Sequence, residues 1–108
     1  MKGVVMFSIQ GEILDFCVLA IVNRSDTYGY EITQKLMATI EISESTLYPV
    51  LRRLLKNGLL ESYDVAFDGR NRRYYRITGA GRDVLNFNKE KWNIYVKHVN
   101  QIVGGNDE

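Results

Sequence analysis

The sequence has little cysteine, proline, histidine or tryptophan: its 108 residues contain one of each. Because Cys17 is alone, the chain cannot form a disulfide framework or a multi-cysteine zinc site by itself. The single histidine, His98, has no evident serine or cysteine partner for nucleophilic catalysis. We therefore expect no enzyme, no metal site and no cofactor.

Long hydrophobic runs are also missing. No uncharged stretch is long enough to cross a bilayer as a helix, and the first residues lack the charged start, apolar run and cleavage site of a signal peptide. We therefore expect no membrane association and a cytoplasmic location. A length of 108 residues, 45% of them hydrophobic, fits a small globular protein.

The net charge of +1 hides an uneven distribution of charged residues. Residues 51–82 carry eight lysines and arginines against three acidic residues, whereas the rest of the chain carries six against ten. Positive charge gathered on one face of a fold creates a local potential that attracts phosphate, even when the molecule is nearly neutral. Charge runs also occur on ordinary solvated surfaces, so this distribution alone leaves both interpretations open.

Two helices are predicted in the first forty residues. Residues 12–22 would be apolar on almost every side of a helix, which favours a helix that is buried on more than one side. We expect part of that surface to be covered by a surface outside its own small domain. A polar turn follows, and a second helix is expected from a cap at Thr27 to about Ile40, because its apolar residues recur at helical spacing.

A third helix is predicted over residues 42–57, with Gly58 as its C-terminal stop. Proline is tolerated best in the first turn of a helix, so the position of Pro49 favours a cap at Ser45 over a cap at Ser43. Either serine could serve.

A β-hairpin and a long helix are expected in the second half of the sequence. Residues 60–67 and 72–78 are rich in β-branched and aromatic residues, and the turn-forming residues 68–71 separate them. Thr78 can then cap a last helix over residues 79–103. Apolar residues in that helix step by three, four and seven, which predicts a face free for self-association. The expected dimer interface is Leu85, Trp92, Tyr95, Val96, Val99 and Ile102.

Three helices followed by a hairpin and a final helix are the layout of a winged helix-turn-helix. The expected fold is mostly α with a small β-hairpin: a winged helix-turn-helix over residues 1–78 and a long C-terminal dimerisation helix over residues 79–108. In this architecture the third helix enters the major groove of double-stranded DNA and the hairpin, or wing, grips the adjacent backbone. The expected DNA contacts are Glu44, Ser45, Thr46, Tyr48, Arg52 and Arg53 from the helix, and Arg70, Arg72 and Arg73 from the wing.

Structural roles compete with these binding roles. Helix capping alone explains a serine at Ser45. Arg76 can pair with Glu61 or Asp64 across the hairpin. Burial of a large ring in an interface accounts for Trp92 without any ligand.

Several segments together resemble the PadR family of bacterial transcriptional regulators. The resemblance covers about residues 10–100, and it is carried by residues 28–32 (Tyr-Gly-Tyr-Glu-Ile), 45–54 (Ser-Thr-Leu-Tyr-Pro-Val-Leu-Arg-Arg-Leu), 58–60 and 69–78. It implies a dimeric winged-helix repressor, in which Tyr28 and Gly69 join the DNA-binding residues.

The resemblance also implies a ligand site. In family members with a single C-terminal helix, the first and last helices of two subunits form the interface and can leave a flat hydrophobic pore. Carried onto this sequence, the pore residues are Ile9, Asp15, Phe16, Trp92 and Val96.

The function expected is that of a homodimeric, sequence-specific DNA-binding repressor. Its partners are double-stranded DNA, a second copy of the chain, and a small planar hydrophobic or aromatic ligand that relieves repression. The alternative is a small-molecule sensor or protein-interaction module without sequence-specific DNA binding.

Overall fold

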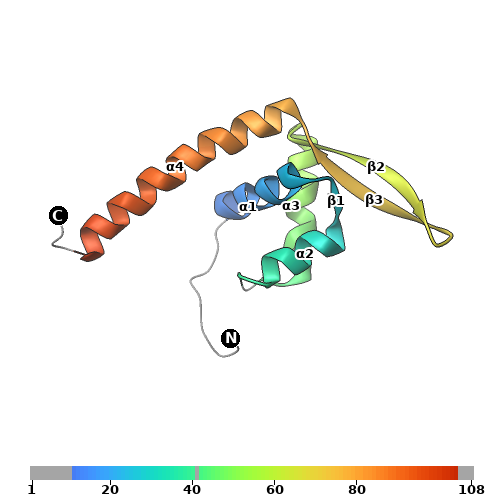
Figure 1. Ribbon diagram of the computed structural model, residues 1–108, viewed down its shortest axis with the longest axis horizontal. Coiled ribbons are helices and arrows are strands. Elements are labelled where there is room, and N and C mark those ends of the chain that lie inside the picture. The colour runs from blue at the N-terminus through green and yellow to red at the C-terminus, as the bar shows by residue number, and fades with distance from the viewer. Residues whose placement is uncertain (1–10, 41, 105–108) are drawn as a thin grey trace.

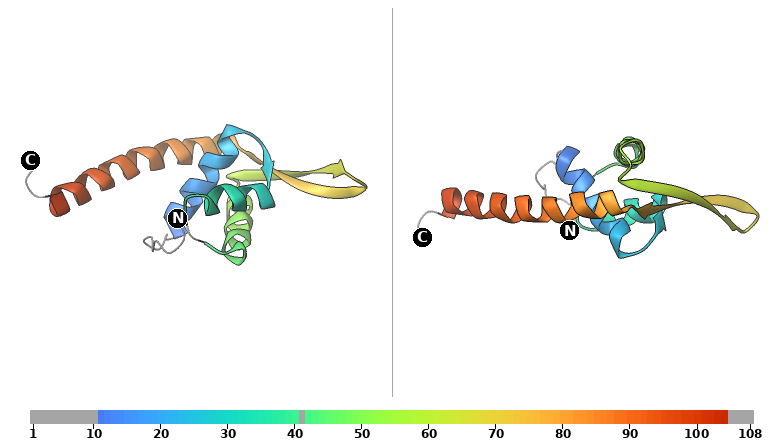
Figure 2. Two further views of the ribbon diagram at one scale, coloured as in Figure 1. Left: turned by 60° about the horizontal axis from the view of Figure 1, so that its bottom comes forward. Right: turned by 90° about the horizontal axis from the view of Figure 1, so that it is seen from above.

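The computed structural model describes residues 11–40 and 42–104, so the predicted pore residue Ile9 lies outside the described residues. Figure 1 shows a helical core from which a β-hairpin and a long helix leave in opposite directions, and Figure 2 shows the same arrangement from two further sides. The elements are α1 (Gly11–Arg24), β1 (Thr27–Tyr28), α2 (Gly29–Met37), α3 (Glu44–Lys56), β2 (Leu60–Phe67), β3 (Arg70–Ile77) and α4 (Gly79–Gly104). The mostly helical fold with a small sheet and a long C-terminal helix is as predicted.

The core forms around α1. Leu14, Val18, Leu19 and Val22 of this helix are all buried. They pack in one cluster with buried leucines, isoleucines and valines from the other helices and from the sheet. Other apolar side chains of α1, such as Phe16, are only partly buried, so the helix is apolar on more sides than its own chain covers.

The start of α2 differs from the prediction. Thr27 does not cap the helix but lies in β1, which pairs with β3 in the sheet order β1-β3-β2. Pairing of Thr27 with Tyr75 and of Tyr28 with Tyr74 holds both residues extended, so the helix begins at Gly29. The Thr27 hydroxyl instead donates to the Glu31 carboxylate. The helix also ends earlier than predicted, at Met37.

The N-cap of α3 is Ser43, not the favoured Ser45. The backbone of Ser43 is extended, and its carbonyl accepts a hydrogen bond from Thr46 N at 3.1 Å. Pro49 therefore lies inside the helix and cannot donate to the carbonyl of Ser45. Ser45 itself is exposed at the surface of the helix.

The C-terminus of α3 confirms Gly58 as the stop. Leu59 N donates to Leu54 O at 2.9 Å, and Gly58 N donates to Leu55 O at 3.0 Å. These two bonds form a Schellman motif.

The hairpin turn is shorter than predicted. Asp68 and Gly69 alone form it, with φ values of 52° and 75°. Two central residues with positive φ define the tight turn that matches the twist of a β-hairpin, and Asp-Gly is a preferred pair for it. β3 therefore begins at Arg70 rather than Arg72, and Arg70 pairs with Phe67.

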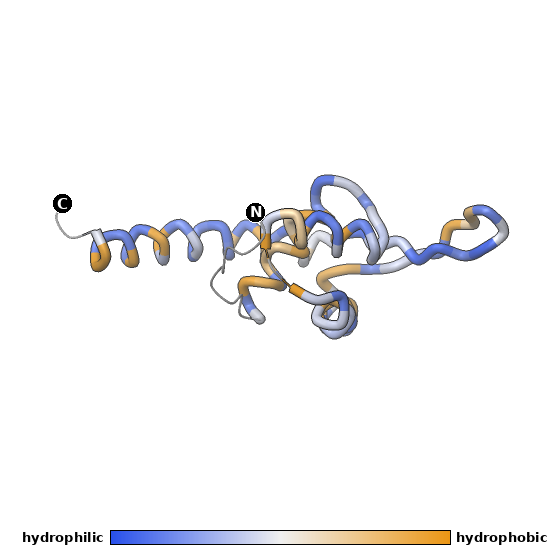
Figure 3. The backbone as a smooth tube through the Cα atoms, turned by 90° about the horizontal axis from the view of Figure 1, so that it is seen from below, coloured by the Kyte–Doolittle hydropathy of each residue, from blue (hydrophilic) through white to orange (hydrophobic). Residues whose placement is uncertain are grey.

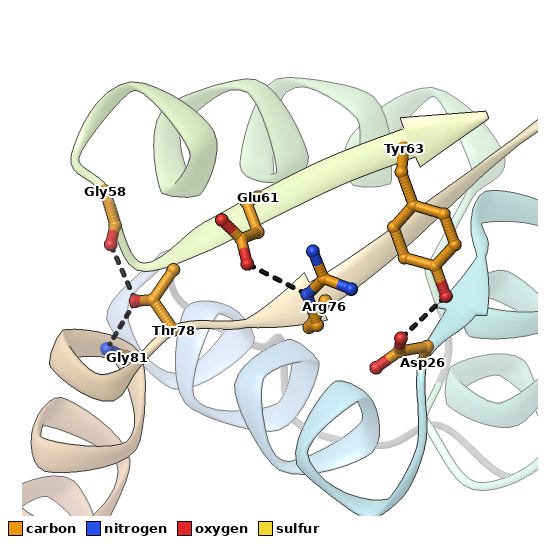
Figure 4. A network of polar contacts seen from close by, with 7 residues as sticks. All are labelled: Asp26, Gly58, Glu61, Tyr63, Arg76, Thr78 and Gly81. Carbon is orange, nitrogen blue, oxygen red and sulfur yellow. Dashed lines mark hydrogen bonds and ion pairs between the residues drawn. The ribbon is translucent and has the colours of Figure 1, made fainter.

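The base of α4 is fixed to the end of α3 and the hairpin. Thr78 caps the helix as predicted: its Oγ1 accepts from Gly81 N at 2.9 Å and donates to Gly58 O at 2.7 Å (Figure 4). Gly81 is buried against the backbone of Leu59, and a Cβ at Gly81 would lie 2.1 Å from that carbonyl oxygen.

We expect Gly81→Ala to lower the free energy of unfolding by about 1 to 3 kcal/mol, because the added methyl forces α4 away from Leu59. Gly79→Ala is the matched control, since a Cβ at Gly79 meets nothing within 4 Å. Denaturant unfolding followed by circular dichroism at equal protein concentrations measures both. Equal stability of the two variants would contradict this close approach.

Candidate nucleic-acid interface

The outer face of α3 is polar and exposed. Leu47, Val50, Leu51 and Leu54 bury the inner face, and the hydrophobic positions repeat every three or four residues. The residues predicted to contact DNA from this helix are all exposed: Glu44, Ser45, Thr46, Tyr48, Arg52 and Arg53. The prediction omitted Lys56, which is exposed one turn after Arg52. Helical spacing from Arg52 would have identified it.

Tyr48 is positioned by the start of α2. A Cβ at Gly29 would lie 3.3 Å from both Cε1 and Oη of Tyr48, so the phenol ring rests where Gly29 has no side chain. Tyr48 is nevertheless 46% exposed. The ring therefore lies at the α2–α3 junction with part of its surface open to solvent.

Arg53 and Asp15, predicted for two different sites, contact each other. The Arg53 guanidinium forms an ion pair with the Asp15 carboxylate, and its Nε donates to Asp15 Oδ2 at 3.3 Å. The hydrogen bond and the charge of Asp15 raise the pKa of Arg53 above its ordinary value. This pair joins α3 to α1 and balances the charge of Arg53, which lies at the edge of the α3 face.

The wing arginines divide between two faces of the hairpin. Successive side chains of a strand point to opposite faces, so Arg70 and Arg72 share one face while Arg73 lies on the other. On that other face Arg73 Nε lies 3.8 Å from Asp64 Oδ1. Within residues 11–40 and 42–104, Arg70 and Arg72 have no carboxylate partner of this kind. The positive charge of the wing that is not paired therefore lies on their face.

Aromatic rings share the face of Arg72. The ring centroids of Tyr28 and Tyr74 are 5.4 Å apart, and those of Tyr63 and Tyr74 are 5.8 Å apart. The Arg72 guanidinium carbon lies 4.1 Å from the ring centroids of both Tyr28 and Phe67. Of these aromatic residues, Tyr28 alone was predicted from the sequence to contact DNA.

A polar network closes the inner end of this face, as Figure 4 shows. Tyr63 Oη donates to Asp26 Oδ2 at 2.6 Å, and this bond is the main reason that the pKa of Tyr63 is raised. Arg76 Nε donates to Glu61 Oε2 at 2.8 Å, which confirms one of the two pairs predicted for Arg76. The Tyr63–Asp26 bond ties the hairpin to the turn before β1, and the Arg76–Glu61 bond joins the two strands of the hairpin to each other.

A cavity of about 230 Å³ lies between α1 and α4. It brings together the predicted pore residues Phe16 and Trp92, whose ring centroids are 6.4 Å apart. Asp15 and Val96 do not line it. The lining residues are Glu12, Ile13, Phe16, Asn88, Lys91, Trp92 and Tyr95. Glu12 and Lys91 form an ion pair beside the rings.

The outer half of α4 carries apolar side chains that its own chain leaves uncovered. Figure 3 shows hydrophobic stretches recurring along one edge of it, and Tyr95, Ile102 and Val103 are 58%, 81% and 78% exposed. Leu85 was predicted to lie in the dimer interface, but it is 1% exposed and packs in the core of its own chain. Exposed Phe87 and Ile94 were not among the predicted interface residues.

Metal binding, membrane spanning and cysteine catalysis each require features that can be sought in the part of the chain that the structure describes. No group of three or more histidine, cysteine, aspartate or glutamate residues there could hold a metal ion. None of the helices there is both long and apolar enough to cross a membrane. Burial raises the pKa of the Cys17 thiol, which is the opposite of what a nucleophilic cysteine needs.

Comparison with known proteins gives the family. Residues 18–86 match the Transcriptional regulator PadR-like family. The chain is 40% identical over 85 residues to uncharacterized protein X of Lysinibacillus sphaericus, a match that covers 73% of this chain and 77% of that protein.

Solved structures agree with this match. The structure of smu.1704 from Streptococcus mutans UA159 has a TM-score of 0.87 and 35% identity, and the match covers 96% of this chain and 98% of that one. Bacillus subtilis PadR in complex with operator DNA has a TM-score of 0.64 and 20% identity, over 68% of this chain and 45% of that chain, and so shows a shared fold. The chain belongs to the PadR-like family of transcriptional regulators.

Proposed function

We propose that this protein is a homodimeric, sequence-specific DNA-binding repressor. The observation that carries the proposal is the presence of two exposed surfaces on the elements that a winged helix uses: the polar face of α3 and the wing face of Arg70 and Arg72. The structural relative from Bacillus subtilis was solved with operator DNA, which supports the same use of the shared fold. Such a regulator would act in the cytoplasm, where bacterial DNA lies.

In this proposal α3 enters the major groove and the wing holds the backbone beside it. Thr46 and Tyr48 offer hydroxyls to base edges or phosphates, and Arg52 offers a planar fork of N–H donors. Arg53 and Arg73 contribute less, since carboxylates already lie beside them.

The dimer forms through the apolar face of α4 together with α1. The exposed side chains of Trp92, Tyr95, Val99 and Ile102 recur every three or four residues. A second copy of this helix can cover apolar side chains with that spacing. Two-fold symmetry then requires a pseudo-palindromic operator, with half-sites about one or two helical turns apart at roughly 34 Å per turn.

A second candidate function is small-molecule sensing at the cavity between α1 and α4. Phe16, Trp92 and Tyr95 line it, and these rings suit a planar hydrophobic ligand. Binding there would alter how the two subunits pack and hence the spacing of their α3 helices, which is how such a ligand would relieve repression. Without DNA binding, the same cavity would make the protein a sensor alone.

We expect Arg70→Ala to weaken binding to specific and non-specific DNA alike, because it removes a phosphate contact. The slope of log K against log salt should become shallower by about one. Fluorescence anisotropy with DNA from upstream of the protein's own gene, over a salt series, measures this. Lys89→Ala is the control, since it removes one positive charge from α4. A wild-type affinity independent of salt would refute the proposal.

We expect Thr46→Ala and Tyr48→Phe to change sequence preference rather than general affinity, because each removes one hydroxyl and no charge. Affinity for the operator should fall while affinity for unrelated DNA stays the same. Competition titrations with both DNAs give the ratio. An unchanged ratio in both variants would place the base-reading surface elsewhere.

We expect Ile102→Glu to shift the protein from dimer to monomer, because the substitution places a charge in the proposed α4 interface. Analytical ultracentrifugation at several concentrations measures the change. Gln101→Glu adds the same charge on the neighbouring residue, outside the series of apolar positions, and should leave the dimer intact. Wild-type protein that sediments as a monomer would overturn the proposed assembly.

A further inference from the structure

The positively charged face of the wing is held together by stacked side chains. Phe67 at the end of β2, Arg72 of β3 and Tyr28 of β1 follow one another, and Tyr74 then continues the row. The guanidinium carbon of Arg72 is 4.1 Å from the ring centroid on each side. Side chains from three strands thus gather around a single cation, with Phe67 and Tyr28 each stacked against the Arg72 guanidinium, an arrangement called the sandwich below.

This sandwich leaves the donor groups of Arg72 free. Rings that stack on a guanidinium occupy its faces, whereas its N–H groups point outward in the plane. Arg72 has no carboxylate partner within residues 11–40 and 42–104, unlike Arg73 beside Asp64. Arg72 is also half-buried, while Arg70 and Asn71 beside it are exposed. The Arg72 side chain is therefore held against two rings, and its charge has no acidic partner among the described residues.

A hollow of about 220 Å³ lies next to this group at the wing tip. Its lining residues are Phe67, Asp68, Arg70, Asn71 and Arg72, so two arginines, one carboxylate and one aromatic ring surround it. Two guanidinium groups beside an apolar wall suit a phosphodiester with its attached sugar.

We propose that Arg72 is a preorganised phosphate-binding residue and that Tyr28 and Phe67 are positioning residues that hold its guanidinium. The proposal rests on the DNA-binding function proposed above and assigns Tyr28 a role through its ring rather than through a direct contact with DNA. A free arginine loses rotamer freedom when it binds phosphate, whereas Arg72 has already lost much of that freedom in the unbound protein. Removing either ring should therefore weaken binding without removing charge.

A double-mutant cycle on the full chain tests this role. DNA affinity is measured by fluorescence anisotropy for wild type, Phe67→Leu, Arg72→Ala and the double variant. We expect Phe67→Leu to weaken binding about 2- to 10-fold with little change in salt slope, since the charge remains. Arg72→Ala should reduce the slope by about one. In the Arg72→Ala background, Phe67→Leu should have no further effect.

Tyr28 provides a second and independent pair of variants. Tyr28→Phe keeps the ring and should bind DNA as wild type does, whereas Tyr28→Leu should lose affinity as Phe67→Leu does. Phe87→Leu is the matched control: its exposed ring lies 5.4 Å from Lys91 Nζ on α4, so the same kind of contact is lost far from the wing. Thermal unfolding of each variant checks that the fold is kept.

The sandwich itself can be observed without DNA. In wild-type protein the Nε–Hε resonance of Arg72 should be shifted upfield by the rings and exchange slowly, and Phe67→Leu should abolish both effects. Two results would overturn the positioning role while DNA binding stands. In one, Phe67→Leu costs the same affinity in the wild-type and the Arg72→Ala backgrounds. In the other, Tyr28→Phe costs as much affinity as Tyr28→Leu. Wild-type protein that binds no DNA would overturn the proposed function, and the phosphate role of Arg72 with it.

Discussion

The pairing of β3 with strands on both sides is the constraint on which the rest of the molecule depends. β3 lies between β1 and β2, so it fixes the start of α2 through β1 and the hairpin through β2. Its alternating side chains then serve two purposes. Tyr75 and Ile77 enter the core, while Arg72 and Tyr74 face outward into the stacked row of the wing. One strand therefore couples core packing to the direction of the wing.

Helix α1 has a similar double role in the helical part. Its buried residues form the centre of the core, and its two acidic residues reach in different directions. Asp15 pairs with Arg53 of α3, and Glu12 pairs with Lys91 of α4. The helix thus lies in contact with both the proposed DNA-reading element and the proposed dimer element. Phe16, which lines the cavity, and Asp15, which pairs with α3, are adjacent residues of this helix.

Much of this architecture follows from local pattern. A continuous apolar run located α1, apolar residues at helical spacing located the other three helices, and Thr78 and Gly58 marked two boundaries through capping chemistry. Contacts between distant segments were not predictable in the same way. The extended state of Thr27 depends on a strand that lies almost fifty residues later in the chain, and the burial of Leu85 depends on the packing of α4 against α1. The place of Arg70 on the same face as Arg72 required the true turn, because the predicted turn kept Arg70 outside the strand.

The same distinction applies to charge. The cluster of basic residues in the sequence does not translate directly into a binding surface, because folding brings carboxylates to some of them: Arg53, Arg73 and Arg76 lie beside Asp15, Asp64 and Glu61. Arg52 and Lys56 on α3, and Arg70 and Arg72 on the wing, lack such partners among the described residues. Within the described residues, four of the five unpaired basic residues of segment 51–82 therefore fall on α3 and the wing, and the fifth, Arg82, falls on α4. Of the paired ones, Arg53 joins α3 to α1, whereas Arg73 and Arg76 join the two strands of the hairpin. Selective neutralisation by the fold, rather than the total basic charge, defines the candidate interface.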